Sequence, residues 1–175
     1  MKNFILKLLA VLLASVLFTD CKKPKTYPAI PTIEFKSLVS QRSISGKDSV
    51  SIITISFTDG DGDIGYHSTG NGALFDDTAS AYYNDFIVSF FQKKNGVWVE
   101  DSLLEHYPYP GFSGRLPYLT PDGDNKALQG DVSMNQYIQF FPVQNDTIRY
   151  EVYIYDRALH KSNTITTSEL VISTY

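Results

Sequence analysis

Alternation of apolar and polar residues is the feature that most limits the folds open to this 175-residue chain. Ile53, Ile55 and Phe57 are separated by hydroxyl-bearing residues, and the same alternation runs over residues 148–154. A period of two is typical of a β-strand with one buried face. Beyond an apolar segment near the N-terminus, no stretch repeats apolar residues at the spacing of an amphipathic helix. The pattern therefore predicts an all-β protein.

A β-hairpin is predicted at Asn95 and Gly96, because this pair readily accepts the positive φ angles of a type I′ turn. The pair separates two strand-like segments, residues 86–94 and 97–100, and the only tryptophan, Trp98, either caps the core there or lies on the surface. Further strands are expected at residues 32–38, 131–141 and 164–173. About seven short strands fit a single antiparallel β-sandwich of immunoglobulin or fibronectin type III character.

The N-terminal segment predicts export. Two lysines, Lys2 and Lys7, precede an apolar run over residues 8–18, as in a secretory signal peptide. The run is too short to cross a bilayer, for which about 20 residues are needed. The only cysteine, Cys21, follows the run, and this arrangement resembles a bacterial lipobox, whose cysteine is lipidated and becomes the first residue of the mature chain.

This resemblance implies three regions along the chain: a lipoprotein signal peptide at residues 1–20, a basic tether at 21–29 and the β-sandwich at 30–175. Phe18 and Asp20 stand where a lipobox usually has Leu and a small residue, so an ordinary secretion signal with an incidental cysteine is the alternative. If Cys21 carries lipid, no thiol remains for a disulfide, and long loops must be held by packing, hydrogen bonds or metal.

Composition and motifs argue against several functions. The formal net charge of −4 argues against nucleic acid or an anionic lipid surface as an electrostatic partner. The histidines at positions 67, 106 and 160 lack the spacing of a zinc site, and no cysteine accompanies them. A nucleophile elbow and a phosphate-binding loop are also missing from the sequence. We therefore expect a protein that is not an enzyme.

The strongest candidate for chemistry is the acidic loop, residues 59–65, in which glycines separate Asp59, Asp61 and Asp63. Three carboxylates at alternate positions can converge on one hard cation, and the pattern predicts a Ca²⁺ site. The loop departs from an EF-hand in its later positions and has no flanking helices. Asp156, after another strand, is the best further ligand, and its alternative role is an ion pair with Arg157. Other possible ligands are Asn71, Asp76, Asp77 and Asp85. The alternative for the whole loop is a solvated turn.

A second candidate region spans residues 106–121 and is rich in aromatic residues and proline. Exposed aromatic rings on a stiff loop can stack on sugars, and an arginine can add hydrogen bonds. The candidate ligand-binding residues are Tyr107, Tyr109, Phe112, Arg115 and Tyr118. The alternative is that the aromatic rings fold back over one end of the sandwich, because a long loop without disulfides needs its own apolar packing.

Three segments, residues 57–65, 94–98 and 155–163, together resemble uncharacterised single-domain lipoproteins of the Bacteroidota. The last of them is similar to the D-x-A-G-N-x-S-N turn of bacterial immunoglobulin-like and fibronectin-like domains, with Leu159 and His160 in place of Gly-Asn. The resemblance implies a β-sandwich anchored by lipid to the outer membrane. The lysines after Cys21 favour its periplasmic face.

Two functional hypotheses follow from the sequence. The first is a membrane-tethered, non-enzymatic module whose acidic loop is ordered by Ca²⁺ and whose partner is a protein or another component of the cell envelope. The second is a carbohydrate-binding module of a glycan-uptake system that uses the aromatic residues of 106–121.

Overall fold

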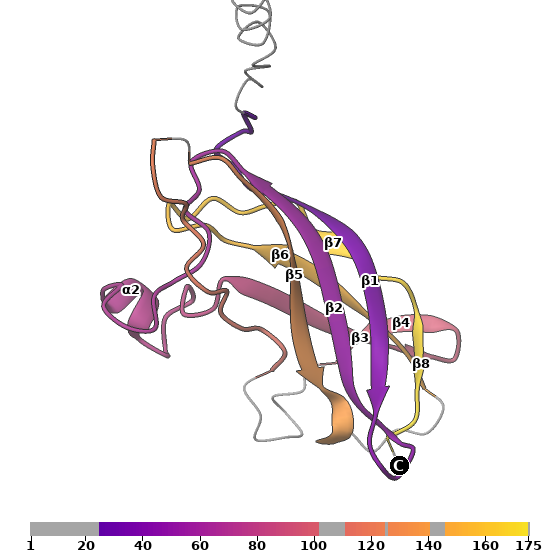
Figure 1. The fold of residues 1–175 in the computed structure, drawn as a ribbon. Coiled ribbons are helices and arrows are strands. Elements are labelled where there is room, and N and C mark those ends of the chain that lie inside the picture. Colours follow the sequence, from indigo (N-terminus) through magenta and orange to yellow (C-terminus); the bar gives the residue numbers. More distant parts are fainter. Residues whose placement is uncertain (1–24, 102–110, 125, 141–145, 175) are drawn as a thin grey trace, which may run out of the picture.

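Two antiparallel sheets pack face to face in this computed structural model, which describes residues 25–101, 111–124, 126–140 and 146–174 (Figure 1). One sheet has the strand order β1-β2-β5, formed by Thr32–Arg42, Asp48–Asp59 and Leu128–Tyr137. The other has the order β4-β3-β6-β7, formed by Val97–Glu100, Phe86–Lys94, Asp146–Ile154 and Ile165–Thr166, and β8 (Leu170–Ile172) also pairs with β6. The predicted all-β sandwich is confirmed.

Helical structure in the described residues is limited to the short α2 (Ala73–Asp76) and a 3-10 turn (Ile138–Phe140). None of the helices in this part of the chain has the length and hydrophobicity needed to span a bilayer.

The hairpin prediction is confirmed, since Asn95 and Gly96 have φ angles of 52° and 80° between β3 and β4. The strand expected at residues 164–173 is instead two short strands, β7 and β8, that pair with different parts of β6. Trp98 is half-buried on the edge strand β4, where the guanidinium carbon of Arg149 lies 4.4 Å from the ring centre.

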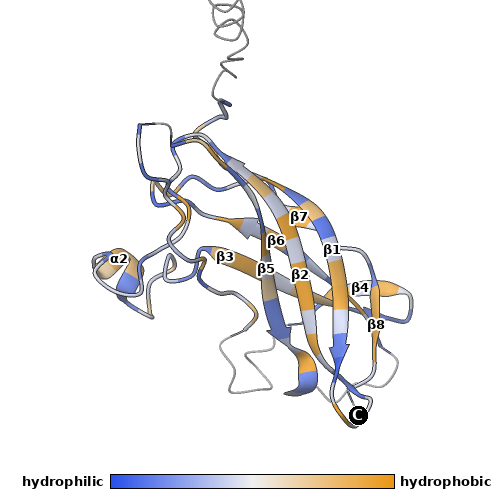
Figure 2. Cartoon of the chain, viewed as in Figure 1, coloured by the Kyte–Doolittle hydropathy of each residue, from blue (hydrophilic) through white to orange (hydrophobic). Residues whose placement is uncertain are grey.

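The alternation seen in the sequence places one face of each central strand in the core. Figure 2 shows apolar and polar positions alternating along β1 and β2. In β2 the side chains of Ile53, Ile55 and Phe57 are buried, and in β6 every second residue over 148–154 is buried. The same register continues past the apolar residues to Asp59 and Asp156, which are both 0% exposed. Two carboxylates therefore occupy positions where core residues would be expected.

Both carboxylates lie at the same end of the sandwich, because Ile64, which follows the acidic loop, forms an antiparallel bridge with Asp156. Residues 25–29, the described part of the predicted tether, reach this end as well. The backbone N–H of Gly60 donates to the carbonyl of Pro28 at 2.8 Å, and the side chains of Lys25 and Tyr27 donate to Gln129 of β5. The acidic loop is thus the point where the tether joins the domain.

Candidate metal centre

The acidic loop begins at the last residue of β2 and turns sharply on glycines. Gly62 has a φ angle of 67°, in the left-handed region that favours glycine. A Cβ atom at Gly62 would lie 2.0 Å from the carbonyl oxygen of Lys126, and one at Gly60 would lie 2.1 Å from that of Tyr27. Glycine is therefore required twice, because the loop packs directly against neighbouring backbone.

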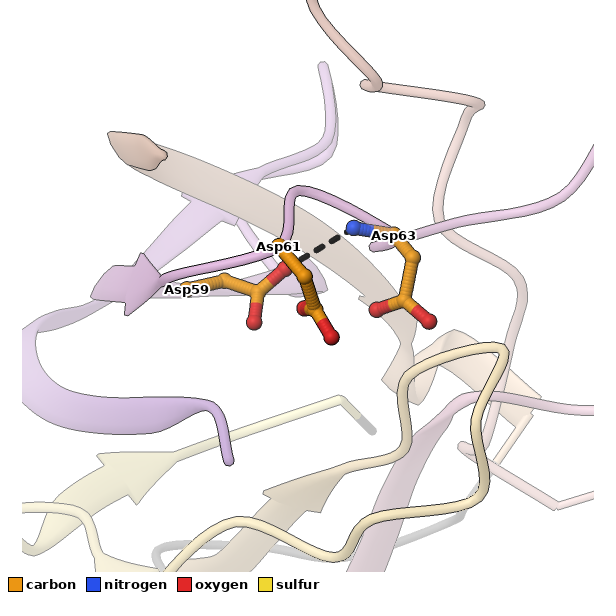
Figure 3. A group of neighbouring side chains, drawn as sticks. All are labelled: Asp59, Asp61 and Asp63. Atoms are coloured by element: carbon orange, nitrogen blue, oxygen red, sulfur yellow. Dashed lines mark hydrogen bonds between the residues drawn. The ribbon is translucent and has the colours of Figure 1, made fainter. Parts of the chain in front are cut away.

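This backbone path brings the three predicted carboxylates together. One oxygen from each of Asp59, Asp61 and Asp63 lies within 4.8 Å of the others, and Figure 3 shows the three carboxyl groups on the same side of the loop. The backbone N–H of Asp63 donates to Asp59 Oδ2 at 2.9 Å, and that of Ala158 donates to Asp63 Oδ2 at 3.0 Å. The loop is thus closed on itself and fastened to the turn after β6.

Each of the two inner carboxylates keeps one unused oxygen. Asp59 Oδ1 and Asp63 Oδ1 are buried and accept no hydrogen bond from any residue that the structure describes. Asp61, in contrast, is exposed to solvent. A buried carboxylate oxygen without a partner is unfavourable, so these two atoms require a ligand or a proton.

The pKa values of Asp59 and Asp63 also show that burial disfavours the ionised form of these carboxyl groups. Burial raises the pKa of Asp59 to about 7, and the negative charges of Asp61 and Asp63 raise it further, whereas the hydrogen bond from Asp63 opposes the change. Burial also raises the pKa of Asp63, with added repulsion from Asp156 and Asp61. Without a cation the cluster is therefore only partly ionised at neutral pH.

Asp156 lies beside the triad but does not belong to it. His160 donates its backbone N–H to Asp156 Oδ1 at 2.7 Å, and its ring Nδ1 lies 2.9 Å from Asp156 Oδ2. The expected alternative, an ion pair between Asp156 and Arg157, is wrong, because the Arg157 guanidinium donates to the backbone of Ile64 and Gly65 instead. Asp156 therefore contributes charge rather than a free oxygen.

Sequence reasoning missed His160 near this end of the sandwich, and it named Asp85 there only as a possible further metal ligand. His160 is the partner of Asp156, and the hydrogen bond to Asp156 together with nearby carboxylates raises its pKa. Asp85, just before β3, is fully buried, and its Oδ1 accepts the backbone N–H of Leu116 at 2.7 Å. As a possible metal ligand Asp85 is not among the carboxylates that converge, since the group that could hold a metal in the described residues is Asp59, Asp61 and Asp63.

The aromatic region gives a mixed result. Phe112 is only 8% exposed and packs against Phe90 and Tyr150 in the core, so it cannot stack on a ligand at the surface. Tyr118 is 40% exposed. Arg115 is partly buried and donates to the carbonyl of Tyr83 at 2.9 Å.

Three predicted residues, Tyr107, Tyr109 and the lipidation candidate Cys21, lie outside the residues that the structure describes.

Comparison with protein-family models, with curated proteins and with solved structures finds no match to this chain. The chemical capacity of the centre is therefore argued from its own residues. Converging carboxylate oxygens are ligands for a hard cation, and the triad could hold one metal ion.

Proposed function

We propose that the chain is a non-enzymatic, lipid-anchored β-sandwich module of the cell envelope whose acidic loop binds Ca²⁺. The observation that carries the metal proposal is the pair of unpartnered, buried oxygens, Asp59 Oδ1 and Asp63 Oδ1, next to the carboxylate of Asp61. A solvated acidic turn accounts for the exposed Asp61. It does not account for two carboxylate oxygens removed from water, which a cation would satisfy.

The donor set favours Ca²⁺ among the common metals. All three side chains offer oxygen, whereas zinc sites are built mainly from sulfur and nitrogen. Ca²⁺ accepts six to eight oxygens in flexible geometry, so carboxylates on one short loop can be completed by water on the exposed side of Asp61. Mg²⁺ demands near-ideal octahedral geometry and is the weaker candidate.

Because the ligands come from a single loop with one exposed side, we expect an affinity for Ca²⁺ that is low among biological sites. Extracellular modules bind Ca²⁺ with Kd values on the order of 10⁻⁴ to 10⁻³ M. Such a site acts as a structural clip, since free ligand at about 100 times Kd adds roughly 2.7 kcal/mol to the free energy of unfolding. For the described residues, none of the three carboxylates forms an ion pair that would replace the metal.

Attachment to the envelope is supported by the signal-like N-terminus and by Cys21.

The fibronectin type III character of the sandwich is supported by the order of strands in the two sheets. If the strands are lettered along the chain, β1, β2 and β5 become A, B and E, and they form one sheet in the order A-B-E. In the other sheet β4 is C′, β3 is C, β6 is F, and β7 and β8 together take the place of G, which gives the order C′-C-F-G. We assign the partner to the same compartment, as a protein or glycan of the cell envelope.

The metal proposal is tested by thermal unfolding of the full chain in detergent, with 10 mM CaCl₂ or with EDTA. We expect Ca²⁺ to raise the Tm by about 3–11 °C, since 10 mM ligand adds about 1.4–2.7 kcal/mol over this range of Kd and about 1 kcal/mol corresponds to 2–4 °C for a domain of this size. Asp61→Asn should reduce the shift, because it removes the charge of an exposed ligand while keeping a side chain of nearly the same shape. Asp124→Asn, in another exposed Asp-Gly-Asp turn, is the matched control. A Tm that is equal in Ca²⁺ and EDTA would remove the metal from the proposal.

A further inference from the structure

A cleft of about 700 Å³ lies between two loops of the same end of the sandwich. One wall comes from the connection between β2 and β3, which spans residues 60–85, and the other from residues 115–118. A connection of this length is far longer than a sandwich needs to join neighbouring strands, and long loops of this kind are commonly functional. The volume falls in the range of pockets that bind small ligands.

The rim of the cleft carries a stacked aromatic pair. The rings of His67 and Tyr118 lie 3.8 Å apart at an angle of 16°. The guanidinium carbon of Arg157 lies 4.5 Å from the centre of the Tyr118 ring, and Arg157 is itself fixed by the carbonyl of Gly65. His67 is exposed, so the stack presents a positioned aromatic surface to a ligand.

The lining of the cleft also carries a pair of opposite charges, Arg115 and Asp76. The guanidinium carbon of Arg115 lies 4.7 Å from the Tyr66 ring and 4.8 Å from the Tyr83 ring. Arg115 Nη2 is 3.6 Å from Asp76 Oδ1, which is too long for a hydrogen bond. The carboxylate of Asp76 is oriented by Asn71, which donates its backbone N–H at 2.8 Å and its side-chain amide at 2.7 Å.

The hydrogen bonds from Asn71 lower the pKa of Asp76 below its ordinary value and so favour the carboxylate form. Its side chain is one-third exposed, so further lone pairs face solvent. Two hydroxyl side chains, Ser68 and Thr69, line the same cleft and can both donate and accept.

We propose that this cleft binds a neutral sugar unit. A sugar ring offers an apolar C–H face for the outer face of the His67 ring, which is stacked on Tyr118, and hydroxyls that donate to Asp76. Phosphate or an acidic sugar would meet the carboxylate of Asp76 as well as Arg115, and a wholly apolar ligand would strip water from both charges. A neutral polyhydroxylated ligand avoids both penalties.

The proposal does not rest on the Ca²⁺ centre. It also differs from the sugar hypothesis drawn from residues 106–121, because it keeps Arg115 and Tyr118 but places His67 and Asp76, from the other loop, at the centre of recognition.

The test is a glycan array printed with both neutral and acidic glycans and probed with the full chain in detergent. We expect binding to neutral glycans that falls about tenfold in His67→Ala, the equivalent of about 1.4 kcal/mol, and falls similarly in Asp76→Asn. Tyr137→Ala is the matched aromatic control, since Tyr137 is 56% exposed at the far end of β5. Thermal unfolding of each variant verifies that it is folded.

Three results would overturn the proposal: no glycan is bound, acidic glycans are bound as well as neutral ones, or His67→Ala binds like the unaltered chain. Asp76→Asn keeps an oxygen that can accept the backbone N–H of Asn71, and unchanged unfolding curves for both variants exclude loss of the fold as the cause of lost binding. Ca²⁺ binding measured on the same samples separates failure of this cleft from failure of the metal centre.

Discussion

Asp85→Asn should make the protein more stable above neutral pH. Asp85 is fully buried, its Oδ1 accepts the N–H of Leu116, and its Oδ2 has no partner among the described residues. Burial raises its pKa from 3.8 to about 7, even though Arg115 and backbone N–H groups favour the ionised form. The folded state therefore holds this proton more tightly than the unfolded state does.

The sign of the pH dependence follows from this difference. Between about pH 4 and pH 7 the folded protein binds more protons at Asp85 than the unfolded chain, so the free energy of unfolding falls as pH rises through that range. The change in pKa from 3.8 to about 7 corresponds to about 4 kcal/mol of lost stability above pH 7. Asparagine has nearly the same shape and keeps the oxygen that accepts from Leu116, but it does not ionise.

The assay is urea unfolding of both proteins in EDTA at intervals from pH 4.5 to 8.5, where EDTA removes any contribution from Ca²⁺. The two curves of unfolding free energy should lie close together at the acidic end. They should separate with rising pH until Asp85→Asn is more stable by up to about 4 kcal/mol. Titration of Asp59 is common to both proteins and cancels in the difference. A difference that does not change with pH, or a variant that is less stable at pH 8.5, would refute the reasoning.

Three further outcomes are expected. Cys21→Ser should abolish incorporation of labelled palmitate and release the protein from membranes; a variant that stays membrane-bound without lipid would contradict the anchor. Gly60→Ala should push the tether off the domain, because its Cβ would clash with backbone, and trypsin should then cut after Lys25 faster than in the unaltered chain. Tyr150→Phe should lower the free energy of unfolding by about 1–3 kcal/mol in urea titrations, since it leaves the buried Ser51 hydroxyl without its 2.6 Å partner; an unchanged midpoint would show that the hydroxyl finds another.

The parts of the structure that could be predicted from sequence are those in which neighbouring residues decide the outcome. Alternation over residues 53–57 and 148–154 specified which face of each strand is buried, and the pair Asn95-Gly96 specified the hairpin turn. The triad was predictable for the same reason, because Asp59, Asp61 and Asp63 share one short loop. None of these features depends on how distant segments meet.

The predictions that were wrong concern irregular segments, where no repeating pattern of apolar residues indicates which side chains are buried. Phe112 lies in such a segment, and only the folded chain shows that it packs on Tyr150 in the core. The partner of Asp156 was also misjudged. Arg157 is adjacent in sequence, but a turn in which Leu159 adopts a φ angle of 67° brings His160 back to the carboxylate instead.

The register of the strands links the core to the candidate metal centre. Asp59 stands two residues after Phe57 on β2, and Asp156 stands two residues after Ile154 on β6, so each carboxylate takes the next inward-facing position of its strand. An apolar residue at Asp59 would bury more favourably, because a buried carboxylate oxygen without a partner destabilises the folded state. The sequence nevertheless places acids at this end of both sheets and surrounds one of them with glycines that hold two more carboxylates close. Local choices that conflict with stability in this way are expected at functional sites. A bound cation would turn the conflict into a stabilising contact at the point where the tether meets the domain.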